Sequence, residues 1–361
     1  MVDLMKDIDI VDVVEGRVKI LPPDPVVYGQ IRSNWDKVAK PLDSMGVFEE
    51  FTARIGAIQG QVSPAMDQCR ILVMCADNGI VEEGISQSDQ SVTALCAGDI
   101  AAGRSCLGVM AAREDIHILA VDMGMNTIGT IPLVRDLKVA PGTANFHKAP
   151  AMTRSQLLLA MQRGMDLVKE SKQEGYTLLG MGEMGIGNTT TSSAVAAALL
   201  SLDPELVTGR GAGLSDAGLA HKKEIIGQAL KTYRLYGADP LEILACVGGF
   251  DIAALVGMCM GGALYHVPIV LDGFISMAAA LAACRIQPGV QDFLIPSHAS
   301  KEPAVVMICK ELGLRPVIDA SMALGEGTGA VLMISLLKTT ALVYMKSRSF
   351  DSAGIEQYER F

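Results

Sequence analysis

The sequence lacks the excess of basic residues that nonspecific nucleic-acid binding requires. Its 361 residues include 30 Lys and Arg against 40 Asp and Glu, so the formal net charge is −10 and the pI is near 5.0. Because displacing counterions from phosphates needs clustered cations, this balance disfavours a nucleic-acid partner. An acidic balance mainly favours solubility.

Paired cysteines, a secretion signal and a histidine cluster are also missing. None of the eight cysteines forms a C-x-x-C pair or a compact disulfide spacing, and most lie in apolar stretches. They indicate a reduced, cytoplasmic protein. The N-terminus, MVDLMKDIDIVD, is acidic and has no basic region followed by an apolar stretch, so no secretion signal is evident. The five histidines are scattered, and we expect each of them to be structural.

One apolar stretch, residues 252–271, is about long enough to span a bilayer. His266, Pro268 and several glycines interrupt it. Continuous apolar runs are also typical of buried parallel strands. We therefore expect a buried helix followed by a buried strand, and no membrane partner.

With 361 residues, half of them hydrophobic, the chain can bury a large core. From about residue 70, apolar strand-like runs alternate with helix-like segments, which predicts an α/β fold with a doubly wound, mainly parallel, Rossmann-like sheet and ligands at the carboxyl ends of its strands. We expect residues 66–331 to form this domain, and residues 1–65 and 332–361 to form a smaller helical subdomain or a dimer interface. The expected strands are RILVMCAD, DIHILAVDMG, YTLLGMG, VPIVLDGF and FLIPSHAS, with RPVIDA as a further candidate.

A glycine-rich loop, GMGEMGIGNTT at residues 180–190, matches G-x-G-x-x-G after an apolar run and before a helix-like segment. A dinucleotide site needs an acid at the end of a second strand about 20 residues later, but Asp203 follows no convincing strand. No Lys-Ser or Lys-Thr completes a P-loop. Glycines before a helix still let backbone N–H groups close around an anion such as phosphate. The alternative is a tight strand-to-helix turn capped by hydroxyls.

Two further glycine clusters carry candidate functional side chains. GRGAGLSDAGLAHKK, residues 209–223, offers Arg210, Lys222 and Lys223 to a phosphate, although a capped helix start with solvated lysines would give the same pattern. In LGEGTGA, residues 324–330, Glu326 sits between glycines that allow close approach to a ligand. Its carboxylate is a candidate general base, and a solvent-facing turn glutamate is the alternative.

In this order, the motifs resemble those of one family, nicotinate-nucleotide:dimethylbenzimidazole phosphoribosyltransferase, which makes the lower-ligand nucleotide of cobamides. The resemblance covers about residues 70–335. It implies transfer of phosphoribose from nicotinate mononucleotide to an aromatic acceptor, with release of nicotinate and without a metal or other cofactor. The motifs that carry it are ADNGIVEEGIS, GTANFHKAPAMT, GMGEMGIGNTT, GRGAGLSDAGLAHK, GGFDIAAL, VLDGFIS, SHASKEP and LGEGTGA.

The resemblance also implies roles for individual residues. Glu326 would be the catalytic base, and Glu183 a second catalytic residue beside the ligand. The nucleotide and its phosphate would contact Gly185, Gly187, Asn188, Thr189, Gly211, Lys222 and Ser300. The acceptor would contact Ser86, Ser88, Gln90, Met184 and Leu324.

The sequence departs from the family pattern at three places. Ser88 and Asp89 stand where members often have Tyr-Pro, Asn78 stands where a His is usual, and Ala323 replaces a common Arg. The acceptor is therefore open between dimethylbenzimidazole and a phenol such as p-cresol. The resemblance implies at least a dimer, either a homodimer or a heterodimer with a paralogous subunit. A noncatalytic or partner-dependent subunit of such a heteromer is the alternative function.

Overall fold

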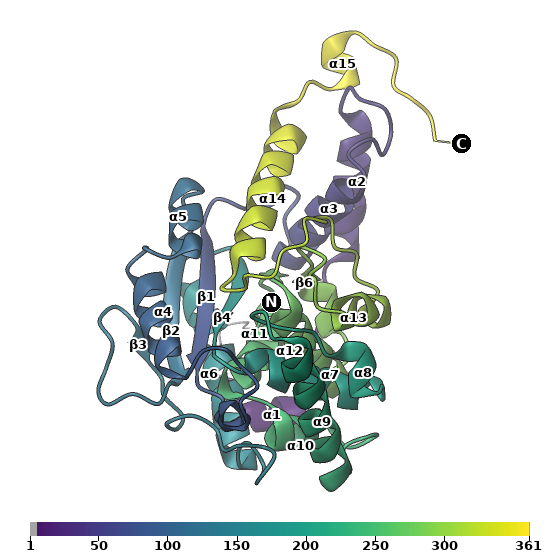
Figure 1. Ribbon diagram of the computed structural model, residues 1–361. Helices are drawn as coiled ribbons and strands as arrows, with labels where there is room; N and C mark the ends of the chain where they lie inside the picture. Colours follow the sequence, from purple (N-terminus) through teal and green to yellow (C-terminus); the bar gives the residue numbers. More distant parts are fainter. Residues whose placement is uncertain (1–5, 361) are drawn as a thin grey trace.

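The computed structural model describes residues 6–360 and centres on a six-stranded sheet in the order β3-β2-β1-β4-β5-β6 (Figure 1). Every neighbouring pair of strands is parallel. The chain runs outward from β1 to β3 and then returns to the other side of β1 with β4, which is the doubly wound arrangement. The predicted fold class is confirmed. The strands are β1 (Cys69–Ala76), β2 (His117–Gly124), β3 (Arg135–Asp136), β4 (Leu178–Met184), β5 (Ile269–Val270) and β6 (Leu294–Ile295).

The five apolar runs expected to be strands overlap β1, β2, β4, β5 and β6. The sixth candidate, RPVIDA, is not a strand. It contributes only an isolated bridge between Ile318 and His298, and its Pro316 has no N–H to donate to a ladder. The strand β3 was not predicted, because two polar residues, Arg135 and Asp136, carry no hydrophobic period.

The sheet is covered on both faces by helices, and the side chains of β1 alternate between two cores. Leu72 and Met74 belong to the larger core, with the helices at Arg154–Gln173, Asn188–Leu200, Pro240–Val247, Phe250–Tyr265 and Phe274–Ile286. Ile71 and Val73 belong to the second core, with the helices at Val47–Gln59, Ser91–Ala101, Cys106–Arg113 and Thr328–Lys346. A strand buried on both faces reads as a continuous apolar run, which is why β1 was visible in the sequence.

The helices have the following bounds: α1 (Ile10–Val14), α2 (Pro25–Lys37), α3 (Val47–Gln59), α4 (Ser91–Ala101), α5 (Cys106–Arg113), α6 (Arg154–Gln173), α7 (Asn188–Leu200), α8 (Pro204–Val207), α9 (Asp216–Thr232), α10 (Pro240–Val247), α11 (Phe250–Tyr265), α12 (Phe274–Ile286), α13 (Ala304–Leu312), α14 (Thr328–Lys346) and α15 (Phe350–Ala353). Two 3₁₀ helices lie at Gly79–Glu83 and Val290–Phe293.

The helix α11 is buried along its whole length and is followed by the buried strand β5. The helix-then-strand prediction for residues 252–271 is therefore confirmed. Two other segments, Ser91–Arg113 and Thr328–Lys346, are long and apolar enough to cross a membrane by length and composition alone. The first is divided into α4 and α5, and half of the second is buried inside the protein.

The terminal segments meet at one end of the molecule, where α2, α3 and α14 lie side by side (Figure 1). Trp35 of α2 is fully buried and packs against Tyr344 of α14, with the ring centroids 5.1 Å apart and the ring planes tilted by 49°. The short helix α1 instead packs on α6, where the Ile10 N–H donates to Gln162 Oε1 at 2.7 Å. The division of the chain at residues 65 and 332 stays a prediction.

Backbone contact through glycines joins α6 and α11. A Cβ atom on Gly164 would lie 1.9 Å from the carbonyl oxygen of Ala254, and one on Gly257 would lie 1.9 Å from that of Met161. The two helices can approach this closely only because both positions lack a side chain.

We predict that Gly257→Ala lowers the free energy of unfolding by about 1–3 kcal/mol, because the new methyl group forces the two helices apart. Urea denaturation measures the change. The matched control is Gly29→Ala on the exposed face of α2, where nothing lies within 4 Å of the new Cβ. That variant should gain up to about 1 kcal/mol from helix propensity. Equal effects of the two substitutions would contradict the proposed packing.

Candidate active site

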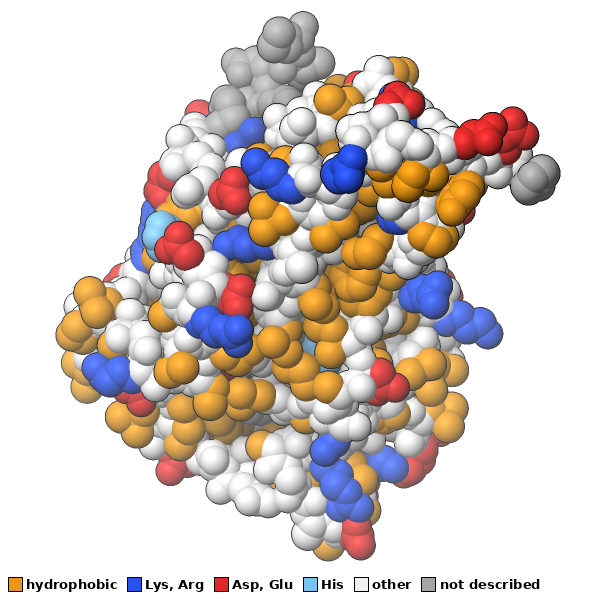
Figure 2. Space-filling model, turned by 90° about the horizontal axis from the view of Figure 1, so that it is seen from above, with side chains coloured by type: hydrophobic (Ala, Val, Ile, Leu, Met, Phe, Trp, Pro, Cys, Tyr) orange, Lys and Arg blue, Asp and Glu red, His pale blue; other side chains and the backbone are white. Residues whose placement is uncertain are grey.

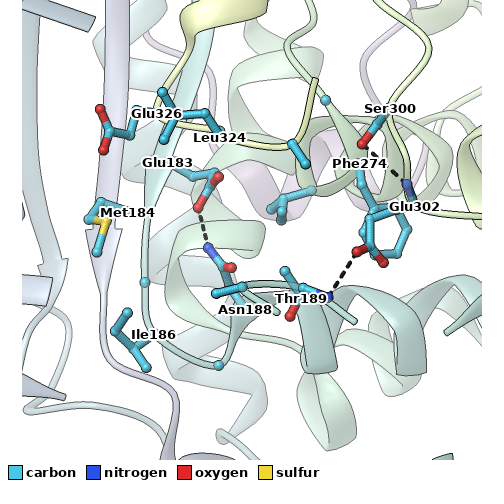
Figure 3. Close-up of a pocket in the computed structure, with 18 of the residues that line it drawn as sticks. Glu183, Met184, Ile186, Asn188, Thr189, Phe274, Ser300, Glu302, Leu324 and Glu326 are labelled. Carbon is cyan, nitrogen blue, oxygen red and sulfur yellow. Dashed lines mark hydrogen bonds between the residues drawn. The ribbon is translucent and has the colours of Figure 1, made fainter. Parts of the chain in front are cut away.

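A pocket of about 250 Å³ lies at the carboxyl ends of β4, β5 and β6. Its walls come from residues 183–189 and 272–276, from the loops around 210–214, 298–302 and 323–326, and from residues 85–87 with Cys96. In Figure 3, Glu326 and Met184 lie on one side and Ser300 and Glu302 on the other. The pocket occupies the place where doubly wound sheets bind their ligands.

Glu326 occupies a strained turn. Its φ angle is 62°, and its neighbours Gly325 and Gly327 have φ angles of 84° and 101°. A left-handed conformation costs a residue with a side chain about 1–2 kcal/mol, so the surrounding structure must stabilise it. One support is β4, because a Cβ atom on Gly182 would lie only 2.4 Å from the carbonyl oxygen of Glu326.

The second support for this turn is Asp272, a buried residue that follows β5. Its Oδ2 accepts the Gly327 N–H at 3.1 Å, and its Oδ1 accepts the Gly329 N–H at 2.7 Å. Gly327 is the N-cap of α14 and has no side chain of its own to satisfy these donors. Asp272 therefore caps a helix from another element and ties the Glu326 turn to the sheet.

The Glu326 carboxyl group has the properties of a proton acceptor. It is half-buried, and one of its oxygens, Oε2, is buried without a hydrogen-bond partner. Burial raises the pKa of Glu326 above its usual value, and the nearby Asp272 charge adds to the shift. A general base works best when its pKa is closer to the operating pH than that of a free carboxylate.

The second acid of the pocket, Glu183, belongs to a buried polar cluster. Asn188 Nδ2 donates a hydrogen bond to Glu183 Oε2 and another to Asp251 Oδ2, the latter at 3.2 Å. Burial, followed by the charge of Asp251, raises the pKa of Glu183 to about 8. Burial likewise raises the pKa of Asp251 to about 6.

Polar groups suited to an anion line the opposite side. Thr189 Oγ1 accepts a hydrogen bond from Lys222 Nζ at 2.9 Å, and the Gly211 N–H donates to Glu302 Oε1, also at 2.9 Å. Lys222 is fully buried and stands behind Thr189. Desolvation lowers the pKa of Lys222 to about 8.

The structure brings most of the predicted site residues together. The residues lining the pocket are Glu326, Glu183, Gly185, Gly187, Asn188, Thr189, Gly211, Ser300, Ser86, Met184 and Leu324. Three do not line it: Lys222, Ser88 and Gln90. The Ser88 N–H donates to Ser86 Oγ at 3.3 Å, and Gln90 Nε2 donates to the carbonyl of Asn78 at 3.1 Å.

Several residues around the site were not predicted to belong to it. Asp272, His298 and Glu302 line the pocket. The sequence could have indicated them, because all three stand among polar residues that directly follow two apolar strands. Asp251 stands in the motif GGFDIAAL, which supported the family resemblance, but no role was predicted for it. Asp203 caps α8 by accepting the Glu205 N–H at 2.9 Å. It therefore does not end a strand, as a ribose-binding acid of a dinucleotide site would.

Comparison with known proteins identifies the family. The family model described as Phosphoribosyltransferase matches residues 20–355. A nicotinate-nucleotide--dimethylbenzimidazole phosphoribosyltransferase from Ruminiclostridium cellulolyticum is 41% identical over 324 residues, which cover 90% of this chain and 92% of that protein. The chain belongs to the nicotinate-nucleotide:dimethylbenzimidazole phosphoribosyltransferase family. The resemblance seen in the motifs is therefore confirmed.

Other members of the family agree in sequence and in structure. The protein of the same name from Acetivibrio thermocellus is 41% identical over 329 residues, covering 91% of this chain and 94% of its own length. The crystal structure of CobT from Thermus thermophilus superposes with a TM-score of 0.87 at 39% identity, covering 92% of this chain and 100% of that chain. The chain is thus a phosphoribosyltransferase, a pentosyltransferase by reaction class.

The hydrogen bonds that Asp272 accepts from the Glu326 turn lead to a prediction about stability. Asp272→Asn should lower the free energy of unfolding by about 1–3 kcal/mol, because the new NH₂ group opposes one of two buried N–H donors. Thermal and urea denaturation measure the loss. The matched control is Asp239→Asn, at the N-cap of α10, where a single N–H, that of Leu241, is accepted at 2.9 Å. Asn caps helices about as well as Asp, so this control should be nearly neutral. An unchanged free energy of unfolding in Asp272→Asn would show that Asp272 does not support the turn.

Proposed function

We propose that this enzyme transfers phosphoribose from nicotinate mononucleotide to an aromatic base, dimethylbenzimidazole or a phenol such as p-cresol. The products are nicotinate and an α-ribotide for cobamide biosynthesis. The observation that carries the proposal is Glu326, a carboxylate with an unpartnered oxygen, in the same pocket as the glycine-rich start of α7. The names of the relatives support the same substrates.

In the proposed reaction, the acceptor attacks C1′ of the ribose on the face opposite to nicotinate. The new bond joins C1′ to the acceptor nitrogen or oxygen, the bond from C1′ to the pyridinium nitrogen breaks, and its electron pair leaves with nicotinate. Glu326 takes the acceptor's proton. Fixing two reactants contributes roughly 7–11 kcal/mol, and a positioned base contributes roughly 10²–10⁴-fold in rate.

We assign the 5′-phosphate to the side of the pocket formed by the start of α7 and the loop at Gly211. Gly187, with a φ angle of 95°, starts α7 and leaves N–H groups at the positive end of the helix dipole. The proposed contacts are Gly185, Gly187, Asn188, Thr189, Gly211 and Ser300, with Lys222 acting through Thr189. In this structure the Gly211 N–H donates a hydrogen bond to the Glu302 carboxylate. That hydrogen bond must break before the Gly211 N–H can donate to a phosphate.

We assign the acceptor to the opposite side, near Met184 and Leu324. Ser86 lines this part of the pocket, and Ser88 supports Ser86 through its N–H. Gln90 lies outside the pocket and donates a hydrogen bond to the carbonyl oxygen of Asn78. Ser88 and Asp89 replace a ring and a proline directly after this wall and do not line it, so the acceptor side should be wider or more polar than in a strict benzimidazole enzyme.

We further propose that the enzyme works as a dimer, either of identical chains or with a paralogous subunit. An apolar face of α14 is exposed, formed by Leu332, Leu336, Leu342 and Met345. Hydrophobic side chains also gather on the face of the molecule seen in Figure 2. Ala323 lies at the pocket and is exposed. A side chain from a second subunit there would make activity dependent on a partner.

The first functional prediction concerns the base. Glu326→Gln keeps the shape but removes the proton acceptor, so turnover should fall by roughly 10²–10⁴-fold, while binding of nicotinate mononucleotide measured by calorimetry is retained. Glu356→Gln, an exposed glutamate near the C-terminus, is the control and should be indistinguishable from wild type. Wild-type turnover in Glu326→Gln would remove Glu326 from the role of base.

The second prediction concerns the acceptor. The enzyme, offered equal concentrations of p-cresol and dimethylbenzimidazole, should form both ribotides, and mass spectrometry quantifies them. The benzimidazole product alone, even when the phenol is offered by itself, would defeat the phenolic assignment and leave the transferase standing. No product from either acceptor until a paralogous subunit is added would establish the partner-dependent alternative.

A further inference from the structure

Glu183, which lines the pocket, and Asp251, which lies behind it, form a buried acid pair. Their exposed fractions are 7% and 0%, and they share one amide group, Asn188 Nδ2. Within residues 6–360, neither acid forms a salt bridge. Glu49 shows the contrast: it is equally buried, and Lys40 and Arg32 both pair with it. The acid pair therefore has hydrogen-bond donors but no compensating positive charge.

Two carboxylates in such a place do not both ionise, because each charge is desolvated and the two repel. Asp251 has the better environment for a charge. Its Oδ1 accepts the Ile252 N–H at 2.9 Å in the first turn of α11, where the helix dipole favours an anion. Among the described residues 6–360, Glu183 accepts a hydrogen bond from the Asn188 amide and from no backbone N–H. The proton of the pair therefore resides on Glu183.

The other titratable groups that face Glu183 reinforce this assignment. Asp272 after β5 and Glu326 before α14 are both acidic and raise the pKa of Glu183. Cys75 on β1 is fully buried, and desolvation raises the pKa of its thiol. The thiol therefore stays neutral and does not change the charge around Glu183. With all these effects together, the pKa of Glu183 is about 8.

We propose that Glu183 acts as a protonated carboxylic acid that donates a hydrogen bond to an oxygen of the bound nucleotide, and that Asp251 and Asn188 are positioning residues that keep it in this form. The identity of the ligand rests on the proposed function. The Asn188 amide already donates a hydrogen bond to Glu183 Oε2. The other oxygen, Oε1, faces the Glu326 turn, because a Cβ atom on Gly325 would lie 2.5 Å from Oε1. Glu183 lines the pocket together with this turn, so a proton on Oε1 stands in the wall that a bound nucleotide would contact.

This assignment gives Glu326 and Glu183 opposite roles. Glu326 accepts a proton, and Glu183 offers one in a hydrogen bond. Nicotinate mononucleotide carries a carboxylate and ribose hydroxyl groups, all of which can accept that hydrogen bond. A neutral Glu183 also spares an anionic substrate the repulsion of a second buried carboxylate.

Infrared spectroscopy of the free enzyme tests the protonation state without any substrate. The difference spectrum between wild type and Glu183→Gln should contain the carbonyl band of a protonated carboxyl group, and this band should disappear as the pH rises through about 8. Asp251→Asn removes a charge that raises the pKa of Glu183, so the disappearance should move to lower pH. Glu49→Gln is the control, and its difference spectrum should show only carboxylate bands. No protonated-acid band at Glu183, or an unshifted one in Asp251→Asn, would overturn the proposal.

Titration with nicotinate mononucleotide tests the donor role. Glu183→Gln keeps a neutral donor of the same shape and should bind within about threefold of wild type, whereas Glu183→Leu should bind roughly tenfold more weakly. Equal losses in both variants would overturn the donor role. If wild type does not bind the mononucleotide, the proposed function fails, while the infrared result still decides the protonation state.

Discussion

The turn at residues 325–327 is the constraint on which the site depends. Three successive residues there are left-handed, and one of them, Glu326, has a side chain. The turn persists because Gly182 on β4 leaves room for its backbone and because Asp272 accepts the N–H groups at the start of α14. Both supports come from neighbouring strands of the sheet. The order β4-β5 in the sheet therefore determines where the candidate base stands.

The charges of the pocket make backbone donors important for an anionic ligand. Among residues 6–360, four acids line it, Glu183, Asp272, Glu302 and Glu326. Lys222 stays behind Thr189, and the Arg210 side chain is engaged by Asp216. In the proposed phosphate site, the N–H groups at the start of α7 and at Gly211 would therefore stabilise much of the phosphate's charge. A neutral Glu183 fits the same requirement, because it removes one negative charge from the pocket.

The fold was predictable from the sequence where burial leaves a pattern. The long strands β1, β2 and β4 are apolar on both faces, and α11 is apolar all round, so each was visible as a run of hydrophobic residues. The strand β3 has two polar residues and no pattern. RPVIDA has a strand-like composition but contains a proline that cannot join a ladder. Local composition therefore identified five of the six strands and missed only the polar edge strand β3.

The candidate site was predictable to the extent that its residues stand in glycine-rich motifs after strands. Glu326 and Asn188 were found in this way and do line the pocket. Asp251 was missed because its contacts arise only when α11 packs against the start of α7. Ser88 and Gln90 were taken from the family pattern as direct contacts, yet the loop before α4 places both outside the pocket. Residues that act on the pocket only through another side chain cannot be recognised from their neighbours in the sequence.

The most direct test of the central claim is a single-turnover reaction of the purified chain with nicotinate mononucleotide, with and without dimethylbenzimidazole. The account predicts that nicotinate is released only when the acceptor is present, and that mass spectrometry finds one α-ribotide for each nicotinate. Release of nicotinate without acceptor, leaving free ribose 5-phosphate, would contradict the account, because it would show hydrolysis in place of transfer.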